Sequence, residues 1–118
     1  MRKPIFTCAF AGLLLLGAGC QRANTIDPKK FYAVLLTNGS VYFGHLDGLG
    51  SDFPVLRDVY YVQSTTNPET KAVNNVLIKR GREWHSPDRM IVSQKAIVFV
   101  EPVGADSKVA QLIAESQK

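Results

Sequence analysis

The side chains best suited to chemistry are two histidines that each stand near an aspartate, His45 with Asp47 and His85 with Asp88. A metal site or a catalytic triad needs such groups to converge from separate places, whereas each of these pairs lies along one short segment. The chain also has no glycine-rich phosphate loop and no HExxH motif. We therefore expect no enzyme activity, no catalytic residue, no metal site and no cofactor.

A second group suits recognition rather than catalysis. Trp84 stands beside His85 and close to Arg82, a composition typical of a protein-binding hot spot. The alternative is that Trp84 folds over one open end of the domain as a lid, and we favour that interpretation. Tyr61 is a further surface candidate, because Tyr60 and Tyr61 point to opposite faces if their strand is regular. The candidate partner-binding residues are thus Trp84, Arg82 and Tyr61.

The third reactive group is the thiol of Cys20, which directly follows the most apolar run of the chain. Residues 1–19 have a basic tip, an uncharged apolar stretch and a small-residue end, the three parts of a signal peptide. From Ile5 to Gly19 there are 15 residues. A helix of that length would cover roughly 22 Å of a membrane core about 30 Å thick, so we prefer a leader to a membrane span.

The end of this leader resembles the lipobox of bacterial lipoproteins. Ala18, Gly19 and Cys20 match that motif, while Gly17 stands where Leu is usual. The resemblance implies cleavage before Cys20 and acylation (palmitate or a similar chain) of its thiol, and therefore a lipid anchor in the cell envelope. By resemblance to the enterobacterial sorting rule, Gln21 rather than Asp after the cysteine implies the outer over the inner membrane. The alternatives are an ordinary cleaved leader and an uncleaved N-terminal anchor. Residues 20–30 are polar and are expected to form a tether.

Net charge gives little sign of a nucleic-acid partner. The whole chain carries +4, but loss of Arg2 and Lys3 with the leader leaves 12 basic against 10 acidic residues, a charge of +2. The densest basic cluster, Lys79-Arg80-Gly81-Arg82, is interrupted by Glu83 and is expected to be a solvated rim. No nucleic-acid binding is therefore expected from composition.

Local patterns predict a mainly β domain over residues 31–118. Asn38-Gly39 between two β-rich runs is a strong hairpin signal, and a turn with positive φ at both central residues is expected. Gly44 predicts a bend or bulge in the second strand. The predicted strands are 31–37, 41–46, 55–63, 76–79, 90–92 and 96–100, with a mobile loop over 64–71.

Near the C-terminus, two further features are expected. The five consecutive apolar residues 96–100 predict a strand covered on both faces. Asp106 or Ser107 is expected to cap a short helix, in which Val109, Leu112 and Ile113 share one face. That helix is too short to be stable alone and must dock on the sheet or on a partner.

Five or six short strands with glycine-marked turns favour a small curled barrel, because closure removes exposed edges. Residues 36–46 (LTNGSVYFGHL), Asp58-Val59 and Lys79-Arg80-Gly81 resemble the strands of Sm-like and SH3-like barrels. The resemblance implies that fold, but the Asn-bearing base-binding loop of Sm proteins is missing after Leu46. Residues 58–62 and 97–101 are also similar to short bacterial proteins of this layout.

The function expected from the sequence is a lipid-anchored, non-enzymatic binding or scaffold module of the bacterial envelope. Its expected contacts are the membrane, through the lipid, and either a protein partner or a second copy through an exposed strand edge. The alternative is an Sm-like nucleic-acid-binding protein with an uncleaved N-terminal membrane segment.

Overall fold

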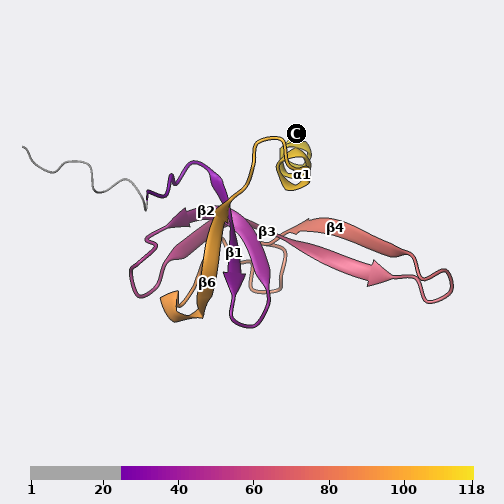
Figure 1. The fold of residues 1–118 in the computed structure, drawn as a ribbon, viewed down its shortest axis with the longest axis horizontal. Helices are drawn as coiled ribbons and strands as arrows, with labels where there is room; N and C mark the ends of the chain where they lie inside the picture. Colours follow the sequence, from indigo (N-terminus) through magenta and orange to yellow (C-terminus); the bar gives the residue numbers. More distant parts are fainter. Residues whose placement is uncertain (1–24) are drawn as a thin grey trace, which may run out of the picture.

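The computed structural model describes residues 25–118, so the expected leader (1–19) and the lipidation site Cys20 lie outside the described residues. The elements are, in chain order, β1 (Phe31–Leu36), β2 (Val41–Asp47), β3 (Val55–Thr66), β4 (Val73–Lys79), β5 (Arg89–Ile91), the 3₁₀ turn η2 (Gln94–Ala96), β6 (Ile97–Pro102) and α1 (Lys108–Ser116). The predicted mainly β fold with a short C-terminal helix is thus confirmed (Figure 1). Within residues 25–118, no helix is long and apolar enough to cross a membrane.

All six strands belong to one antiparallel sheet. Its order is β4-β3-β2-β1-β6, and β5 pairs with the first residues of β3. Tyr60 is paired with Phe43 of β2 on one side and with Lys79 of β4 on the other. In the described part of the chain no ladder joins β4 or β5 to β6. The sheet is therefore open by its strand pairing, and closure into the predicted barrel is not confirmed.

The hairpin of β1 and β2 forms where Asn38-Gly39 predicts it, but its turn is of another type. Of the two residues Asn38 and Gly39, only Gly39 has a positive φ, 88°. The Gly39 N–H bonds to the Leu36 carbonyl, and the Asn38 side chain accepts the Ser40 N–H at 2.9 Å. These bonds describe a type I turn followed by one left-handed residue, so the expectation of two positive φ angles was wrong.

A bulge interrupts the β2–β3 ladder at Gly44, as predicted, but its extra residue belongs to β3 and not to the second strand. Phe43 pairs with Tyr60 and His45 pairs with Arg57, so two residues of β3 stand opposite Gly44 alone. One of these two, Asp58, has a φ of 51°. A Cβ atom on Gly44 would lie 2.8 Å from the Arg57 carbonyl oxygen, so the bulge needs a glycine here.

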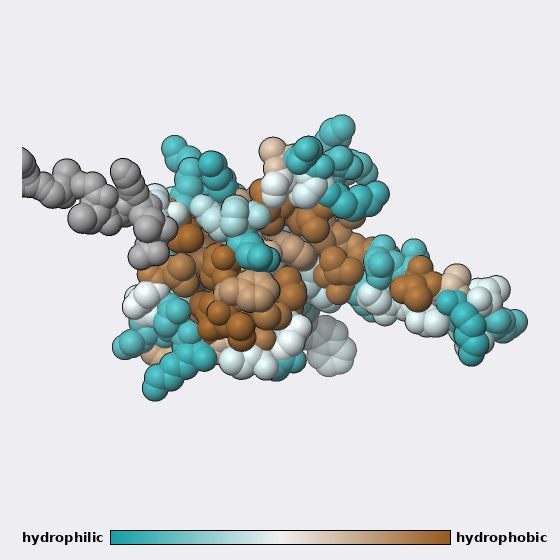
Figure 2. Space-filling model, in the orientation of Figure 1, coloured by the Kyte–Doolittle hydropathy of each residue, from teal (hydrophilic) through white to brown (hydrophobic). Residues whose placement is uncertain are grey.

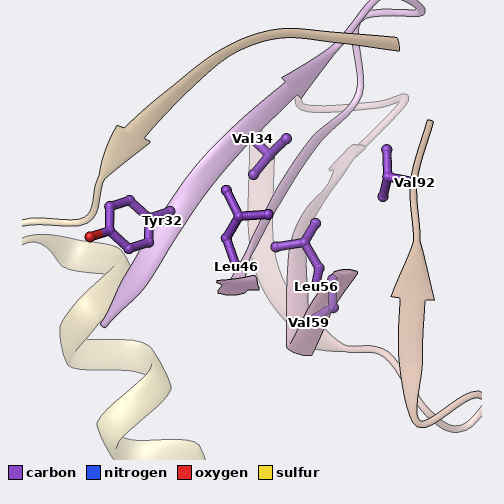
Figure 3. Packing of buried hydrophobic residues seen from close by; sticks show 6 residues of the cluster. All are labelled: Tyr32, Val34, Leu46, Leu56, Val59 and Val92. Atoms are coloured by element: carbon purple, nitrogen blue, oxygen red, sulfur yellow. The ribbon is translucent and has the colours of Figure 1, made fainter. Parts of the chain in front are cut away.

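The core lies on one face of the curved sheet. Its buried members come from β1, β2, β3 and the link after β5, and Tyr32 lies at one end of the cluster, near the helix (Figure 3): Tyr32, Val34, Leu46, Leu56, Val59 and Val92. Ile26, which precedes β1, also packs against this cluster. The Tyr32 hydroxyl lies 2.9 Å from the Asp27 backbone nitrogen, whose N–H it accepts. Residues 26 and 27 therefore contact the folded body.

The second half of β3 and most of β4 leave the sheet as a two-stranded projection (Figure 1). We call residues 61–78 the arm, with its tip at Asn67–Ala72. Both predicted strands here were too short, because β3 continues to Thr66 and β4 begins at Val73. The predicted mobile loop over 64–71 was therefore wrong in its first three residues. Polar residues can form these strands because both faces of the arm lie in water and no core has to be filled.

The last strand also differs from its prediction. β6 is at the edge of the sheet and is not covered on both faces, since Val98 and Phe99 are 54% and 46% exposed. An apolar area is visible where β1 and β6 lie (Figure 2).

The C-terminal helix docks on the sheet, one of the two expected outcomes. The Ser107 hydroxyl accepts the Ala110 N–H at 3.0 Å, so Ser107 and not Asp106 is the cap. Ile113 is buried, and Ser116 Oγ lies 3.0 Å from Tyr60 Oη. α1 thus covers the face of the sheet opposite the core.

Candidate protein-binding surface

The loop between β4 and β5, residues 80–88, carries the candidate binding residues. It begins where the β3–β4 ladder ends, with the Arg80 N–H bonded to the Val59 carbonyl at 2.7 Å. Val59 belongs to the β3 bulge opposite Gly44, so the bulge helps to set the point from which the loop departs. The loop is therefore joined to the core by backbone hydrogen bonding at its root.

Glu83 holds the loop in one conformation. Its carboxylate accepts the Gly81 N–H at 2.8 Å and the Arg80 Nε–H at 3.0 Å. The Gly81 N–H and then the Arg80 side chain lower the pKa of Glu83 from 4.5 to about 2. The carboxylate is thus ionised at neutral pH, and both bonds are charge-assisted.

Trp84 lies on a tight turn that follows from this arrangement. The Ser86 N–H donates to the Glu83 carbonyl at 2.8 Å, which places Trp84 and His85 at the two central positions. Trp84 has a relative exposure of 105%. The predicted lid is therefore wrong, because no part of residues 25–118 covers this side chain. A fixed turn presents the indole to solvent instead.

Arg82 shares this exposed loop, whereas Tyr61 does not. Arg82 is exposed and makes no ion pair with any of residues 25–118. Tyr61 is half-buried at the root of the arm, with its ring 6.2 Å from that of Tyr42 in an edge-on arrangement. The Arg80 guanidinium lies 5.9 Å from the centre of the Tyr42 ring. Tyr61 is thus linked to the loop through Tyr42 and Arg80, and it lies beside the surface rather than at its centre.

A hollow of about 280 Å³ lies beneath the loop, between the β3 bulge and the start of β5. Its lining carries charges of both signs, including Asp58, Arg80 and Asp88. Arg80 is paired with Glu83, and the Arg89 guanidinium lies 3.6 Å from Asp88. Because its charges are largely paired, the hollow offers no concentrated field for an anion or a cation.

The two histidines do not come together. The His45 ring lies against the Phe31 ring, with 4.0 Å between the ring centres. Its Nδ1 donates a hydrogen bond to the Lys30 carbonyl at 2.9 Å, and its Nε2 lies 3.8 Å from the Asp58 carboxylate. Since a carbonyl can only accept, Nδ1 carries the proton. Asp47 pairs with Arg57 instead. Within residues 25–118, no three His, Cys, Asp or Glu side chains are grouped as ligands for a metal ion.

Sequence reasoning missed Glu83, which orders the loop. Two features of the sequence could have indicated this role: Glu83 follows Arg80 by three residues, and Gly81 lies between them. In the structure, Gly81 has a φ of 127°. Comparison with known proteins found no matching family model and no matching curated sequence.

Proposed function

We propose that this protein is a lipid-anchored, non-enzymatic binding module of the bacterial envelope, which holds another protein through Trp84 and Arg82. The observation that carries the proposal is the full exposure of Trp84 on a turn fixed by Glu83. A large aromatic side chain exposed on an ordered turn gains by burial, and the backbone that carries it has little conformational entropy left to lose.

The free energy available from burying Trp84 in a partner is appreciable. A tryptophan buries 150–250 Å² in a packed contact, which at about 25 cal/mol per Å² corresponds to roughly 4–6 kcal/mol before the costs of association. Arg82, two residues earlier in the same loop, adds an exposed cation that makes no ion pair with residues 25–118. A partner with an apolar pocket rimmed by a carboxylate fits this pair of residues.

A photo-cross-linking amino acid placed at position 84 tests the surface in the producing cells. The matched control is position 53, because Phe53 is also an exposed aromatic residue, 64% exposed, but lies in the loop between β2 and β3. We expect a discrete adduct with another protein from position 84 and none from position 53. Equal adducts from both, or none from either, would contradict the proposal. Oligonucleotide binding that weakens steeply with salt would instead favour the Sm-like alternative.

Membrane attachment is proposed through Cys20 by its likeness to a lipobox. Two or three acyl chains would hold the protein firmly, since each buried CH₂ contributes about 0.8 kcal/mol. The test is mass spectrometry of protein isolated from its own membranes, with Cys20→Ala as control. Acylated Cys20 at the new N-terminus is expected, and an unmodified thiol still joined to Met1 would refute the anchor.

We also propose that the sheet is a small barrel of the Sm-like or SH3-like kind. The support is that all strands except β4 contribute to one core, and that β5 and β6 are joined through a single 3₁₀ turn. A crystal or solution structure in which β6 stays remote from β4 and β5 would reject it.

A further inference from the structure

The arm has an outer edge that is unusually open to pairing. β4 is the last strand of the sheet, so one of its edges has no partner among residues 25–118. Its strands, residues 61–66 and 73–78, contain no charged residue and no proline. Val73 and Val76 are 64% and 44% exposed. Natural sheets protect exposed edges with charges, prolines or bulges, whereas the β4 edge carries a single charge, Lys79 at its root, and no proline or bulge.

The other edge strand does carry such protection. β6 ends in Glu101-Pro102, and its pairing with β1 is interrupted by a bulge. The contrast between the two edges singles out β4. An isolated two-stranded ribbon is also only marginally stable in water, whereas three or more strands support one another.

Hydrogen bonds at the two ends of the β3–β4 ladder show which groups face outward. The Arg80 N–H bonds to the Val59 carbonyl, and the Asn67 N–H bonds to the Ala72 carbonyl. Because bonding alternates along an antiparallel strand, the even-numbered residues of β4 bond to β3. The backbone groups of the odd-numbered residues therefore point outward: Val73, Asn75, Leu77 and Lys79.

We propose that two copies of the protein pair through β4, antiparallel, about a twofold axis at Val76. All seven residues of β4 are then paired, with Val76 facing Val76 of the partner subunit. The outward-bonding residues meet one another, since Val73 stands opposite the partner's Lys79 and Asn75 opposite the partner's Leu77. The two arms form one four-stranded ribbon.

A second copy suits this edge because the register is self-complementary. Each strand meets its own sequence reversed, over its full length, and no like charges are placed opposite one another. The apolar contact at the axis covers the exposed Val76 side chains. Figure 2 shows isolated apolar patches on the arm, among hydrophilic residues. The inference goes beyond the proposed function, develops the second copy expected at an exposed strand edge, and is independent of binding through Trp84.

Charge exchange at the axis tests the pairing. Val76→Lys and Val76→Glu each place like charges face to face, and we expect either change to weaken dimerisation by about tenfold or more. An equimolar mixture of the two variants should restore the dimer. The matched control is Gln63→Lys, because Gln63 lies on the same face, directly beside Val76 but one strand farther from the axis. It should dimerise like the unchanged protein.

The measurement is sedimentation equilibrium of the full-length protein, purified from its membranes in detergent, with circular dichroism to verify folding. A monomeric unchanged protein, or variants that dimerise normally, would overturn the proposal. Failure of the mixture to recover the dimer would overturn this register. Trp84→Ala should leave the dimer intact, and Val76→Lys should leave adducts from position 84 in place, so the two proposals can fail separately.

Discussion

Gly44→Ala tests whether the β3 bulge, from which the loop with Trp84 departs, requires a glycine opposite it. The new methyl group would lie 2.8 Å from the Arg57 carbonyl oxygen and 3.1 Å from Leu56 Cδ2. The first distance is about 0.6 Å shorter than the 3.4 Å at which ordinary contact begins. The carbonyl cannot yield easily, because Arg57 is paired with both His45 and Arg89.

Overpacking of this kind costs about 1–3 kcal/mol. For a domain of this size, 1 kcal/mol lowers Tm by roughly 4–8 °C, so we expect a fall of about 4–24 °C. Thermal unfolding followed by circular dichroism measures it. The matched control is Gly104→Ala, since a Cβ there meets only Asp106 Oδ1, at 3.7 Å, and the residue has no positive φ. A Gly44→Ala protein as stable as this control would refute the requirement for a glycine opposite the bulge.

Two further predictions concern the helix cap and the loop. Ser107→Ala removes the hydroxyl that accepts the Ala110 N–H and should cost about 1 kcal/mol in urea unfolding, whereas Ser93→Ala, at a cap without a side-chain bond, should cost almost nothing. Trp84 is the one tryptophan of the chain, so its fluorescence anisotropy reports how ordered the 80–88 loop is. This anisotropy should be constant above pH 4.5. Because the pKa of Glu83 is lowered on folding from 4.5 to about 2, its stabilisation is present above pH 4.5 and is lost as the pH falls toward about 2. Glu83→Gln should show low anisotropy at every pH, and an unchanged anisotropy in that variant would contradict the role of the carboxylate.

Signals that act over a few residues predicted the fold well. The Asn38-Gly39 hairpin, the bulge at Gly44 and the Ser107 cap are each set by contacts between near neighbours or by the absence of a side chain. The turn type was wrong because Asn-Gly suits two kinds of turn. The Asn38 side chain, by accepting the Ser40 N–H, is compatible with the one observed.

Errors occurred where burial was used to infer strands. Hydrophobic alternation detects a face that is turned toward a core, and the arm has no such face, so residues 64–66 and 73–75 were assigned to loops or left unassigned. The reverse error was made at β6, where Val98 and Phe99 are apolar but lie on an edge strand. In both the arm and β6, the strand is determined by backbone pairing with a neighbouring strand, which depends on the rest of the sheet.

Trp84 was misassigned for a related reason. Its hydrophobicity favours burial, but its position follows from the carboxylate of Glu83 and the turn to Ser86, which hydrophobicity does not encode. The exposure of the side chain is therefore imposed by polar contacts around it. An apolar side chain that its surroundings keep exposed to water is a strong candidate for a binding residue.

The two proposed surfaces are connected through β4. Its outer edge is the proposed dimer contact, and its last residue, Lys79, leads directly into the loop with Trp84. In the twofold register the partner's Lys79 stands opposite Val73, six residues from Lys79 along the strand, so the roots of the two loops would be roughly 20 Å apart along the ribbon at 3.4 Å per residue. Two tryptophans presented at a fixed spacing can engage a partner at two points, and the second contact then forms at a high effective concentration. Weak single contacts would thereby suffice for stable retention, the more so if the proposed lipid anchors hold both copies at one membrane.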